Sequence, residues 1–472
     1  MKLRGVSAAL AVVAVVATSC GEPAPPTPRP PDARIVAAAI TEAGLRGRLE
    51  ALAAATAGSD RYRAVGTEGY DAAADLVERE LRAAGWSVSQ DAYGGAAFFD
   101  EGGSFLAVGG RTFRVADVRP LIFAPAGDVE GPVVPIDWAL DAPAGTAKGC
   151  AVTHYGTLPP NAIVIIRQGP CLLRDQVIAA QKAGAAAFVA VYPQMPPGVV
   201  YRPTLIESRL MEIPALVVSR EAADALLAAA ADRATAHLVT HARTTAAPTR
   251  SIMAELPGSD LGAVIMLGAH LDSVIDGPGI NDDGSGVAAL LEIARALAGT
   301  RPRATIRLAF WSGEEMGLHG SYRYASTLTA DQRQAILVYL NVDMIASPNG
   351  FAGVYEESGA PAGSTVAHDL LVAAVERAGG TPVGIDLGGG SDHYGFAEAG
   401  VPTAGVFSGA GEPVAAEQAA ASGAAAGQPA DACYHQPCDD LANADLPLAR
   451  LLAASLADVV VRVANNPELL RR

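Results

Sequence analysis

Positive charge is scarce in this sequence of 472 residues. The 34 lysines and arginines stand against 50 aspartates and glutamates, which gives a formal net charge of −16. Such an acidic surface argues against nucleic acid and anionic membranes as partners. Charged residues of both signs are few, at 18%, whereas 50% of the residues are hydrophobic. This composition excludes a disordered chain and predicts a globular protein, whose length favours two domains.

The sequence also lacks tandem repeats of the solenoid type. Its N-terminal apolar stretch, residues 6–17, is shorter than the roughly 20 residues of a membrane span. Lys2 and Arg4 precede this stretch, and small residues and Cys20 follow it. The arrangement predicts an export signal over residues 1–19 that is removed from the mature protein.

Residues 17–20 (ATSC) resemble the bacterial lipobox, in which the cysteine becomes the acylated first residue. Ala17 departs from that motif, because leucine is usual at its position. The following residues, 20–32, are rich in proline and predict a stiff, extended linker. We therefore expect an exported protein, anchored to the cell surface through a lipid on Cys20 or secreted after ordinary cleavage.

Cysteine is rare as well, with five residues in the chain. Acylation of one of them would leave four, enough for two disulfides in an exported protein. Proximity along the chain favours Cys150–Cys171 and Cys433–Cys438, although three pairings are formally open.

The remaining chain divides into three regions. Residues 33–103 have helical periodicity followed by a strand over 87–93, and residues 104–246 are short β-like runs with a helix over 173–183. Residues 247–468 alternate strands with helices; the strands are expected over 251–255, 263–269, 304–311, 335–342 and 403–407, and the helices over 286–297, 321–328, 364–378 and 446–464. This alternation predicts an α/β fold, a three-layer sandwich with a mixed, largely parallel central sheet flanked by helices.

Five clusters of acids and histidines lie in the last region. They are His270-Leu271-Asp272, Asn281-Asp282-Asp283, Gly313-Glu314-Glu315, Asn341-Val342-Asp343 and Cys433-Tyr434-His435. Three of the clusters directly follow predicted strands. Because ligands bind beyond the carboxyl ends of strands in open α/β sheets, we expect these side chains to meet at one edge.

Each cluster has a chemical interpretation. His270 is a candidate metal ligand, and Asp272, which shares its parity in extended backbone, is a candidate to orient the imidazole. Asp282 lies among glycines, where a carboxylate can approach and bridge two cations. Asp283, its neighbour, is the better candidate for the N-cap of the following helix.

The adjacent carboxylates of Glu314 and Glu315 would repel each other at a strand end unless a cation lies between them or one of them is protonated. One of the two can bind metal while the other accepts a proton from water. Asp343 follows an apolar run, where an unpaired carboxylate would be costly to bury. His435 and His393 compete for the second imidazole position, and spacing alone does not separate them. Carboxylate and imidazole ligands without thiolates favour zinc, with manganese or cobalt as alternatives. Two such ions, bridged by one carboxylate and a water, form a known hydrolytic arrangement.

These motifs together resemble the co-catalytic bi-zinc aminopeptidase family, which includes secreted bacterial leucyl-type aminopeptidases and is related to glutamate carboxypeptidase and the transferrin receptor. The resemblance rests on HLDS (270–273), GINDDGSG (279–286), SGEEMGLHGS (312–321), NVDM (341–344), GGSDHYGF (389–396) and CYHQPCDD (433–440). Arg63 and the following GTEGY (66–70) also resemble the opening segment of that family.

The resemblance implies two Zn²⁺ per chain. It assigns the metal ligands as His270, Asp282, Glu315, Asp343 and His435, with Asp282 bridging, and so prefers His435 over His393. It further implies Glu314 as the general base, Asp272 behind the first histidine, and Tyr434 as a stabiliser of the oxyanion.

The middle region resembles a protease-associated domain, which in this family covers the active-site mouth or restricts access. The similar stretches are residues 148–150, 162–171, 181–185 and 213–217. The implied division is a first part of the zinc peptidase domain over 33–103, the protease-associated insert over 104–246, and the remainder of the catalytic domain over 247–468. Three scattered histidines of the insert, His154, His237 and His241, are expected to be structural.

The expected function is an exported aminopeptidase that hydrolyses N-terminal residues from peptides through a metal-bridged water. One alternative is a carboxypeptidase for acidic C-termini, which would need basic pocket residues. Residues 388–390 are glycines where some relatives carry a substrate-binding arginine, so they give it no support. A glutaminyl cyclase would use a single zinc on the same scaffold, and a receptor-like module would lack ligands.

Overall fold

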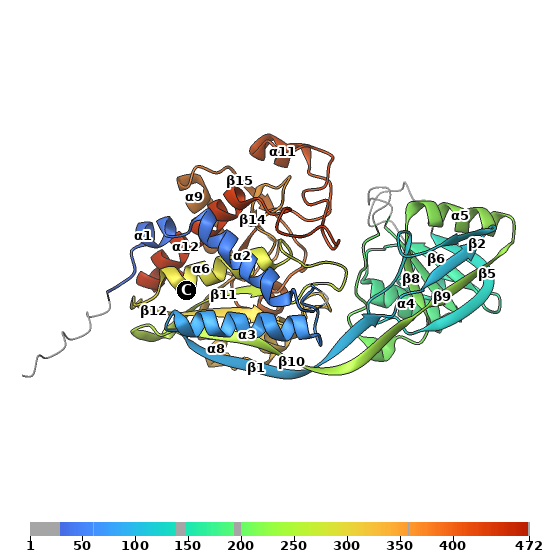
Figure 1. The fold of residues 1–472 in the computed structure, drawn as a ribbon, viewed down its shortest axis with the longest axis horizontal. Helices are drawn as coiled ribbons and strands as arrows, with labels where there is room; N and C mark the ends of the chain where they lie inside the picture. Colours follow the sequence, from blue (N-terminus) through green and yellow to red (C-terminus); the bar gives the residue numbers. More distant parts are fainter. Residues whose placement is uncertain (1–28, 60, 138–147, 193–199, 357, 471–472) are drawn as a thin grey trace, which may run out of the picture.

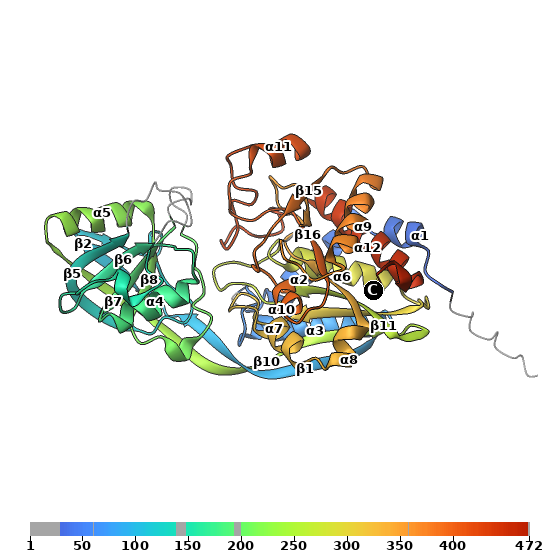
Figure 2. The same ribbon diagram turned by 180° about the vertical axis from the view of Figure 1, so that it is seen from behind.

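The computed structural model describes residues 29–59, 61–137, 148–192, 200–356 and 358–470. The predicted export signal and Cys20 lie outside these residues. Two eight-stranded sheets form two lobes, which we call the main lobe and the insert (Figure 1). Seen from behind, the same two lobes remain joined by one long pair of strands (Figure 2). No helix among the described residues is long and apolar enough to cross a membrane.

The sheet of the main lobe has the order β1-β10-β12-β11-β13-β16-β14-β15. Its strands are β1 (Ser87–Asp100), β10 (Ala242–Leu256), β11 (Asp260–His270), β12 (Ala304–Trp311), β13 (Ile336–Val342), β14 (Ala352–Tyr355), β15 (Pro382–Ile385) and β16 (Thr403–Phe407). The four central strands, from β12 to β16, pair in parallel, and β1, β10 and β14 add antiparallel pairs. The carboxyl ends of the parallel strands therefore share one edge.

Helices cover both faces of this sheet, which makes three layers. The helices of the main lobe are α1 (Ala33–Ala38), α2 (Glu42–Thr56), α3 (Glu68–Ala83), α6 (Gly284–Ala296), α7 (His319–Thr327), α8 (Ala330–Ala335), α9 (Ser364–Arg377), α10 (His393–Glu398), α11 (Ala416–Ser422) and α12 (Leu446–Asn465), of which α11 lies at the periphery. Helices α6 and α12 each begin at a side-chain cap. The Asp283 carboxylate accepts a hydrogen bond from the Gly286 amide at the start of α6, and the Asp445 carboxylate accepts one from the Leu448 amide at the start of α12. Such caps satisfy amides that the first helical turn leaves unpaired.

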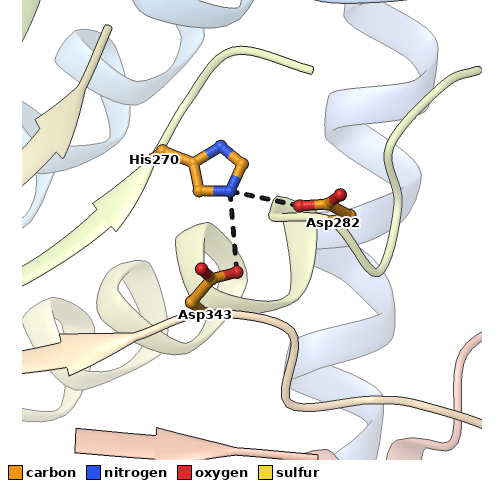
Figure 3. Close-up of side chains that lie close together, drawn as sticks. All are labelled: His270, Asp282 and Asp343. Atoms are coloured by element: carbon orange, nitrogen blue, oxygen red, sulfur yellow. Dashed lines mark ion pairs between the residues drawn. The ribbon is translucent and has the colours of Figure 1, made fainter. Parts of the chain in front are cut away.

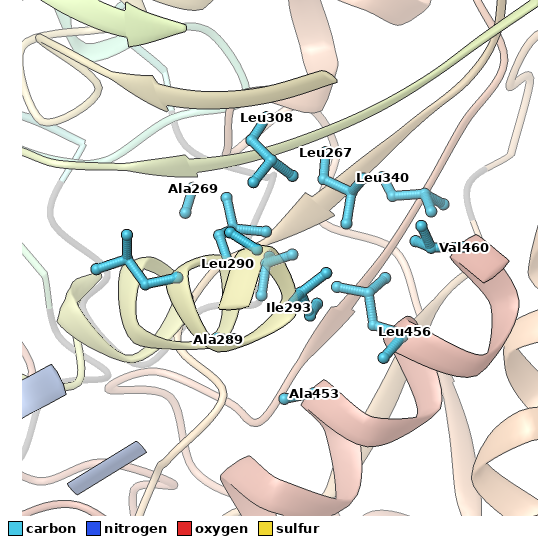
Figure 4. Packing of buried hydrophobic residues seen from close by; sticks show 14 of the residues in the cluster. Leu267, Ala269, Ala289, Leu290, Ile293, Leu308, Leu340, Ala453, Leu456 and Val460 are labelled. Atoms are coloured by element: carbon cyan, nitrogen blue, oxygen red, sulfur yellow. The ribbon is translucent and has the colours of Figure 1, made fainter. Parts of the chain in front are cut away.

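Strand β11 explains how the layers form. Its side chains alternate, so that Leu267 and Ala269 pack under α6 and α12 while Met266 faces the other layer. Figure 4 shows Leu267 and Ala269 against Leu290 and Ile293 of α6, with Leu456 and Val460 of α12 beside them. The opposite layer contains α7 and α10, with Trp311, Tyr339 and Phe396 in its core. Burial on both faces accounts for the nearly continuous apolar runs of the central strands.

The insert is built on a second sheet, in the order β3-β2-β9-β5-β6-β7-β8-β4. Its elements are β2 (Phe105–Val108), β3 (Arg111–Phe113), β4 (Val118–Pro120), β5 (Gly127–Asp137), β6 (Ile163–Arg167), α4 (Leu173–Lys182), β7 (Ala187–Val191), β8 (Ala215–Val218), α5 (Arg220–Ala231) and β9 (Thr235–Thr240). Short 3-10 turns occur at Val152–His154 and Ser208–Leu210 in this lobe and at Pro467–Leu469 in the main lobe.

The two lobes are connected by β1 and β10, which run side by side from one lobe into the other (Figures 1 and 2). They pair antiparallel without interruption, from Ser87 opposite Glu255 to Asp100 opposite Ala242. The chain thus leaves the main lobe on one strand and returns on its neighbour, as an inserted domain requires.

The expected fold class is confirmed, and the strands over 304–311 and 403–407 have the predicted bounds. The sequence does not predict helices α5, α8, α10 and α11 or strands β3, β4, β9, β14 and β15. Helix α5 is mostly alanine, which favours helix but gives little amphipathic contrast. Strands β14 and β15 have four residues each and contain glycine, so their alternation is too short to recognise. Both expected disulfides, Cys150–Cys171 and Cys433–Cys438, are formed.

Candidate metal centre

The predicted metal ligands meet at the carboxyl edge of the central strands. His270 ends β11, Asp343 follows β13, and Glu315 lies in the loop after β12. Asp282 comes from the turn before α6, and His435 from a loop near the C-terminus. All five side chains are buried. Segments far apart in the sequence therefore deliver two imidazoles and three carboxylates to one place.

Three of these side chains form a first group, shown in Figure 3. The Nε2 atom of His270 lies 3.1 Å from Oδ1 of Asp282 and 3.6 Å from Oδ1 of Asp343. Three ligand atoms, one from each residue, all lie within 4.8 Å of one another. A single cation among them could contact all three.

A second group shares one residue with the first. The Nε2 atom of His435 lies 3.0 Å from Oδ2 of Asp282 and 3.0 Å from Oε2 of Glu315. Its ligand atoms also lie within 4.8 Å of one another. The two oxygens of Asp282 thus face different imidazoles, an arrangement suited to a carboxylate that bridges two cations.

The electrostatics of both groups favour positive charge. Burial lowers the pKa of His270, but Glu314, Asp282 and Asp343 outweigh it, and the pKa is well above its usual value. The same holds for His435. Burial lowers its pKa, but Glu315 and Asp282 have a larger, opposite effect, so the pKa is well above its usual value. Burial raises the pKa of Asp282, yet the two histidines beside it, His270 and His435, bring the pKa below its usual value. The acids raise the pKa of both imidazoles, so their surroundings favour positive charge, which a cation could supply.

The unsatisfied oxygens fit the same conclusion. Within the described residues, Oε1 of Glu315 is buried without a hydrogen bond. Oδ2 of Asp282 and Oδ1 of Asp343 are also buried; a histidine Nε2 lies 3.0 and 3.6 Å from them, but neither pair has good hydrogen-bond geometry. A buried carboxylate oxygen without a partner is costly, and a metal ion would satisfy it. The buried guanidinium of Arg63 does not bond these oxygens; it donates to the carbonyls of Leu271, Pro278 and Gly279. The donor set of imidazoles and carboxylates suits zinc.

Asp272 has a different contact from the one expected. The Nδ1 atom of His270 lies 3.0 Å from the backbone carbonyl oxygen of Asp272, not from its carboxylate. The carboxylate instead accepts hydrogen bonds from the amides of Gly313, Glu314 and Glu315. The extended backbone on which the parity argument depended ends at His270, so the Asp272 side chain turns to the neighbouring loop. Asp272 therefore orients the His270 imidazole through its backbone carbonyl. Its carboxylate holds the backbone amides of the loop that carries Glu314 and Glu315.

Asp283 caps α6, as predicted, and its carboxylate also accepts hydrogen bonds from outside the helix. Besides the Gly286 amide, its carboxylate accepts the amides of His270 at 3.1 Å and Met344 at 3.1 Å. It is fully buried, and burial raises its pKa well above the usual value. One side chain therefore connects the turn that carries Asp282 to the ends of β11 and β13.

A chain of hydrogen bonds supports Asp343 from behind. The Ser391 hydroxyl donates to Oδ2 of Asp343 at 2.6 Å, and Asn341 donates to the Ser391 hydroxyl at 2.8 Å. The same Asn341 amide donates to Tyr355, whose ring meets that of His393 edge-on at 4.9 Å. His393, the competing imidazole, is buried in this supporting layer and belongs to neither ligand group.

Glu314 and Tyr434 line a cavity of about 630 Å³ that opens onto both groups. Burial raises the pKa of Glu314 well above its usual value, with Glu315, Asp392 and Asp343 adding to the rise, although part of the side chain still reaches the cavity. A carboxyl with a raised pKa is a stronger proton acceptor when ionised. Burial also raises the pKa of Tyr434, so its hydroxyl keeps its proton and can donate a hydrogen bond.

Two residues of the site escaped prediction, Tyr201 and Arg202, and both belong to the insert. The Tyr201 ring stacks on His435 with centroids 5.2 Å apart, and the Arg202 guanidinium bonds Asp276 of the loop before Asp282. Neither lies in a cluster of acids or histidines, and no pattern in the local sequence marks them. The three histidines expected to be structural, His154, His237 and His241, belong to neither ligand group.

The chain is similar to known proteins over most of its length. The model of "Peptidase family M28" matches residues 251–460, and that of the "PA domain" matches residues 129–226. The chain is 35% identical over 419 residues to the "Probable lipoprotein aminopeptidase LpqL" of Mycobacterium tuberculosis, covering 85% of this chain and 81% of the relative. It is 33% identical over 415 residues to an "Aminopeptidase" of Pseudomonas aeruginosa, covering 84% and 76%.

Two solved structures share the fold along most of the chain. An aminopeptidase from Aneurinibacillus sp. strain AM-1 aligns with a TM-score of 0.72 at 22% identity, covering 92% of this chain and 96% of its own. The zinc aminopeptidase BSAP from Bacillus subtilis aligns with a TM-score of 0.68 at 20% identity, covering 91% and 96%. The arrangement of the main lobe and the insert is therefore shared with proteins of distant sequence.

Proposed function

The chain belongs to peptidase family M28 and carries an inserted PA domain, and from that premise we propose that it is an exported, zinc-dependent aminopeptidase. Relatives that match it over most of its length are named aminopeptidases. The observation that carries the proposal is the sharing of Asp282 between two buried ligand groups at one cavity.

Two zinc ions would be held by the five predicted ligands. His270 and Asp343 would bind one ion, Glu315 and His435 the other, and Asp282 both; their distances and unsatisfied oxygens support this set. When bound, the ions would supply positive charge that lowers the pKa of a water toward about 7 and stabilises the charge of the transition state.

The other steps fall to side chains of the chain itself. Glu314 would accept a proton from the attacking water and later return it to the leaving amine, as a general base and acid. Tyr434, which lines the same cavity, would donate a hydrogen bond to the oxyanion. Asp272 would hold the Gly313–Glu315 loop through its three amide bonds and so fix the position of Glu314.

The cavity wall supports an N-terminal substrate with an apolar side chain. Apolar residues line much of it, including Met344, Phe351, Ile385, Phe407 and Val414. The charged lining residues other than the proposed ligands and base are acids, Asp386 and Glu412. An acidic wall attracts a protonated α-amine and repels a carboxylate.

The same wall disfavours a carboxypeptidase for acidic C-termini. No lysine or arginine is among the described residues that line the cavity, although such an enzyme needs a cation there. A receptor-like module is disfavoured because every ligand position and the base are occupied by competent side chains.

Export remains part of the proposal, with a lipid on Cys20 as the anchor or ordinary secretion as the alternative. Two disulfides support an oxidising compartment, and the relative from Mycobacterium tuberculosis is named a lipoprotein. Peptide or protein N-termini would be the substrates.

The purified full chain allows a direct test. Zinc content would be measured alongside hydrolysis of leucine-p-nitroanilide and of an N-blocked peptide with a free C-terminus. We expect two zinc ions per chain, hydrolysis of the first substrate alone, and loss of activity with a chelator that zinc reverses. Cleavage of the N-blocked peptide alone would indicate a carboxypeptidase, and one zinc with cyclisation of N-terminal glutamine would indicate a cyclase. Bound zinc without any turnover would indicate a binding module.

A further inference from the structure

A short segment of the insert reaches the main lobe beside the proposed metal centre. We call residues 201–206 the docking segment. It is fixed to the insert by backbone bonds: the Ile122 amide donates to Pro203, and the Leu205 amide donates to Ile122. Its other side contacts three loops of the main lobe.

Tyr201 contacts the loop that carries His435. Its ring stacks on His435 with centroids 5.2 Å apart and an interplanar angle of 25°, and on Tyr434 at 5.8 Å and 17°. Tyr192 of the insert also contacts Tyr201, edge-on, with centroids 5.5 Å apart. His435 itself has a positive φ of 55°, a backbone conformation that needs support from its surroundings. The Tyr201 ring supplies such support from the opposite lobe.

Arg202 contacts the loop that carries Asp282. Its side chain is 2% exposed, and its Nε and Nη2 atoms bond both carboxylate oxygens of Asp276 at 2.8 and 3.0 Å. The same Nη2 bonds Asp100 at the end of β1 at 2.8 Å. Arg119 of the insert completes the cluster at 3.2 Å from Asp276 and also donates to Gln436, the neighbour of His435. Two cations and two anions balance, so the cluster is buried without net charge.

Thr204 and Ile206 contact the loop that carries Glu315. The Thr204 hydroxyl donates to the Met316 carbonyl at 3.2 Å, and the Ile206 carbonyl lies 3.0 Å from Nε2 of His319. Gly317 passes so close to Ile206 that a Cβ at that position would lie 2.9 Å from its side chain. The docking segment therefore touches the loops of Asp282, Glu315 and His435, which together are the second ligand group.

Asp282 is shared by both groups, but the two ligands that belong to the first group alone are supported differently. His270 ends β11 and Asp343 follows β13, both in the middle of the sheet. The Asp272 carbonyl and the Ser391 hydroxyl, which orient them, also belong to the main lobe. No contact joins the docking segment to either residue among the bonds and ring contacts of the described chain.

We propose that the docking segment is a positioning element for the Asp282–Glu315–His435 group, so that the insert determines the affinity of one of the two metal ions. This inference rests on the proposed function, because it requires that both groups bind zinc. The insert is then a structural part of the metal centre in addition to any role at the cavity mouth. Tyr201 and Arg202 act through the ligands and do not themselves bind metal.

The experiment is an equilibrium titration of zinc at buffered free concentrations on the full chain, with bound zinc counted by mass spectrometry. Tyr201→Ala should lower the affinity for one of the two ions by roughly tenfold or more, which is the usual cost of losing a residue that orients a ligand. The affinity for the other ion should be unchanged. Tyr201→Phe keeps the stacked ring and should restore the affinity. Arg111→Met is the matched control, because Arg111 forms an exposed ion pair elsewhere in the insert.

A second measurement identifies the affected ion. In a His435→Ala background, which already lacks the imidazole of the second group, Tyr201→Ala should cause no further loss. Arg202→Met, once its folding has been checked by circular dichroism, should also weaken the binding of the second ion. Because Asp282 belongs to both groups, the first ion should lose affinity as well, but less than the second.

The outcomes separate this inference from the proposed function. Wild-type chain that binds no zinc, or one ion, contradicts the proposed function. Wild-type chain with two ions, but unchanged affinities in Tyr201→Ala, contradicts the positioning role alone. Equal weakening of both ions, or a Tyr201→Phe variant as weak as Tyr201→Ala, also contradicts it, because the effect would then be general or due to the hydroxyl.

Discussion

The main lobe and the insert both contain an eight-stranded sheet with parallel strands at its centre, yet only one of them gathers acids. In the main lobe, β11 and β13 end at His270 and Asp343, and the loop after β12 carries Glu314 and Glu315. In the insert, β6, β7 and β8 are followed by Gln168, Tyr192 and Ser219. Both candidate metal groups of the described chain lie in the main lobe.

The difference shows that the edge of a parallel sheet only offers a position for a site, and that the side chains at that edge determine whether it can bind metal. The insert has a similar arrangement of strands, but among its described residues no acid or histidine directly follows β6, β7 or β8. Its contribution is made instead at its boundary, where Tyr201 and Arg202 meet loops of the main lobe. Experiments on matched residues of the two lobes can test this division.

The largest effect is expected at Glu314. Glu314→Ala should reduce kcat by a factor of about 10² to 10⁴, since a positioned general base contributes that much, while both zinc ions stay bound. Hydrolysis of leucine-p-nitroanilide and zinc content would be measured together. The matched control is Glu130→Ala, an exposed glutamate on β5 of the insert, which should change neither. Loss of zinc in Glu314→Ala would assign this residue to metal binding instead.

An intermediate effect is expected from the hydrophobic cores. Leu308 of β12 and Leu226 of α5 are both fully buried, one in the core of the main lobe and the other in a core formed wholly by the insert. Leu308→Ala and Leu226→Ala should each lower the free energy of unfolding by about 2–5 kcal/mol, because each leaves a cavity. Calorimetry should show two transitions, each variant shifting a different one. A single transition shifted equally by both would mean that the lobes unfold as one unit.

The sequence predicts most of the main lobe because its signals are local. The apolar runs over 304–311 and 403–407 are buried on both faces and end at turn residues, so their bounds are recognisable. The acids that follow the strands indicate a shared edge for the same reason. His435 is harder, since spacing alone does not distinguish it from His393, and only the family resemblance favours it.

Contacts between distant segments are what the sequence does not predict. The Arg202–Asp276 and Tyr201–His435 contacts join residues that are 74 or more positions apart, with no periodicity to mark them. The Asp272 carboxylate is another case, since its bonds to three amides of the next loop depend on where β11 ends. These contacts follow from how the lobes and loops pack, which no local pattern encodes.

The smallest effect concerns an ion-paired acid far from the cavity. Asp458 of α12 accepts hydrogen bonds from Arg462 at 2.7 Å and Arg377 at 2.5 Å. Burial raises its pKa, but the two arginines outweigh burial and bring the pKa below its usual value. At the site itself the balance is reversed: burial dominates at Asp392 and raises its pKa to about 7.

A pKa that is lower in the folded than in the unfolded chain stabilises the fold above the unfolded value, which is about 3.9, and the stabilisation is lost as the pH falls below it. Asp458→Asn should therefore reduce the free energy of unfolding at pH 7 by at most about 1 kcal/mol, as expected for partly solvent-screened pairs, and by less near pH 3. Urea unfolding of zinc-free protein at both pH values would measure this. Glu221→Gln is the control in the insert, because Glu221 is 65% exposed in its pair with Arg111 and should contribute nothing measurable. An Asp458→Asn penalty that is the same at both pH values would mean that the aspartate acts through packing or hydrogen bonding and not through its charge.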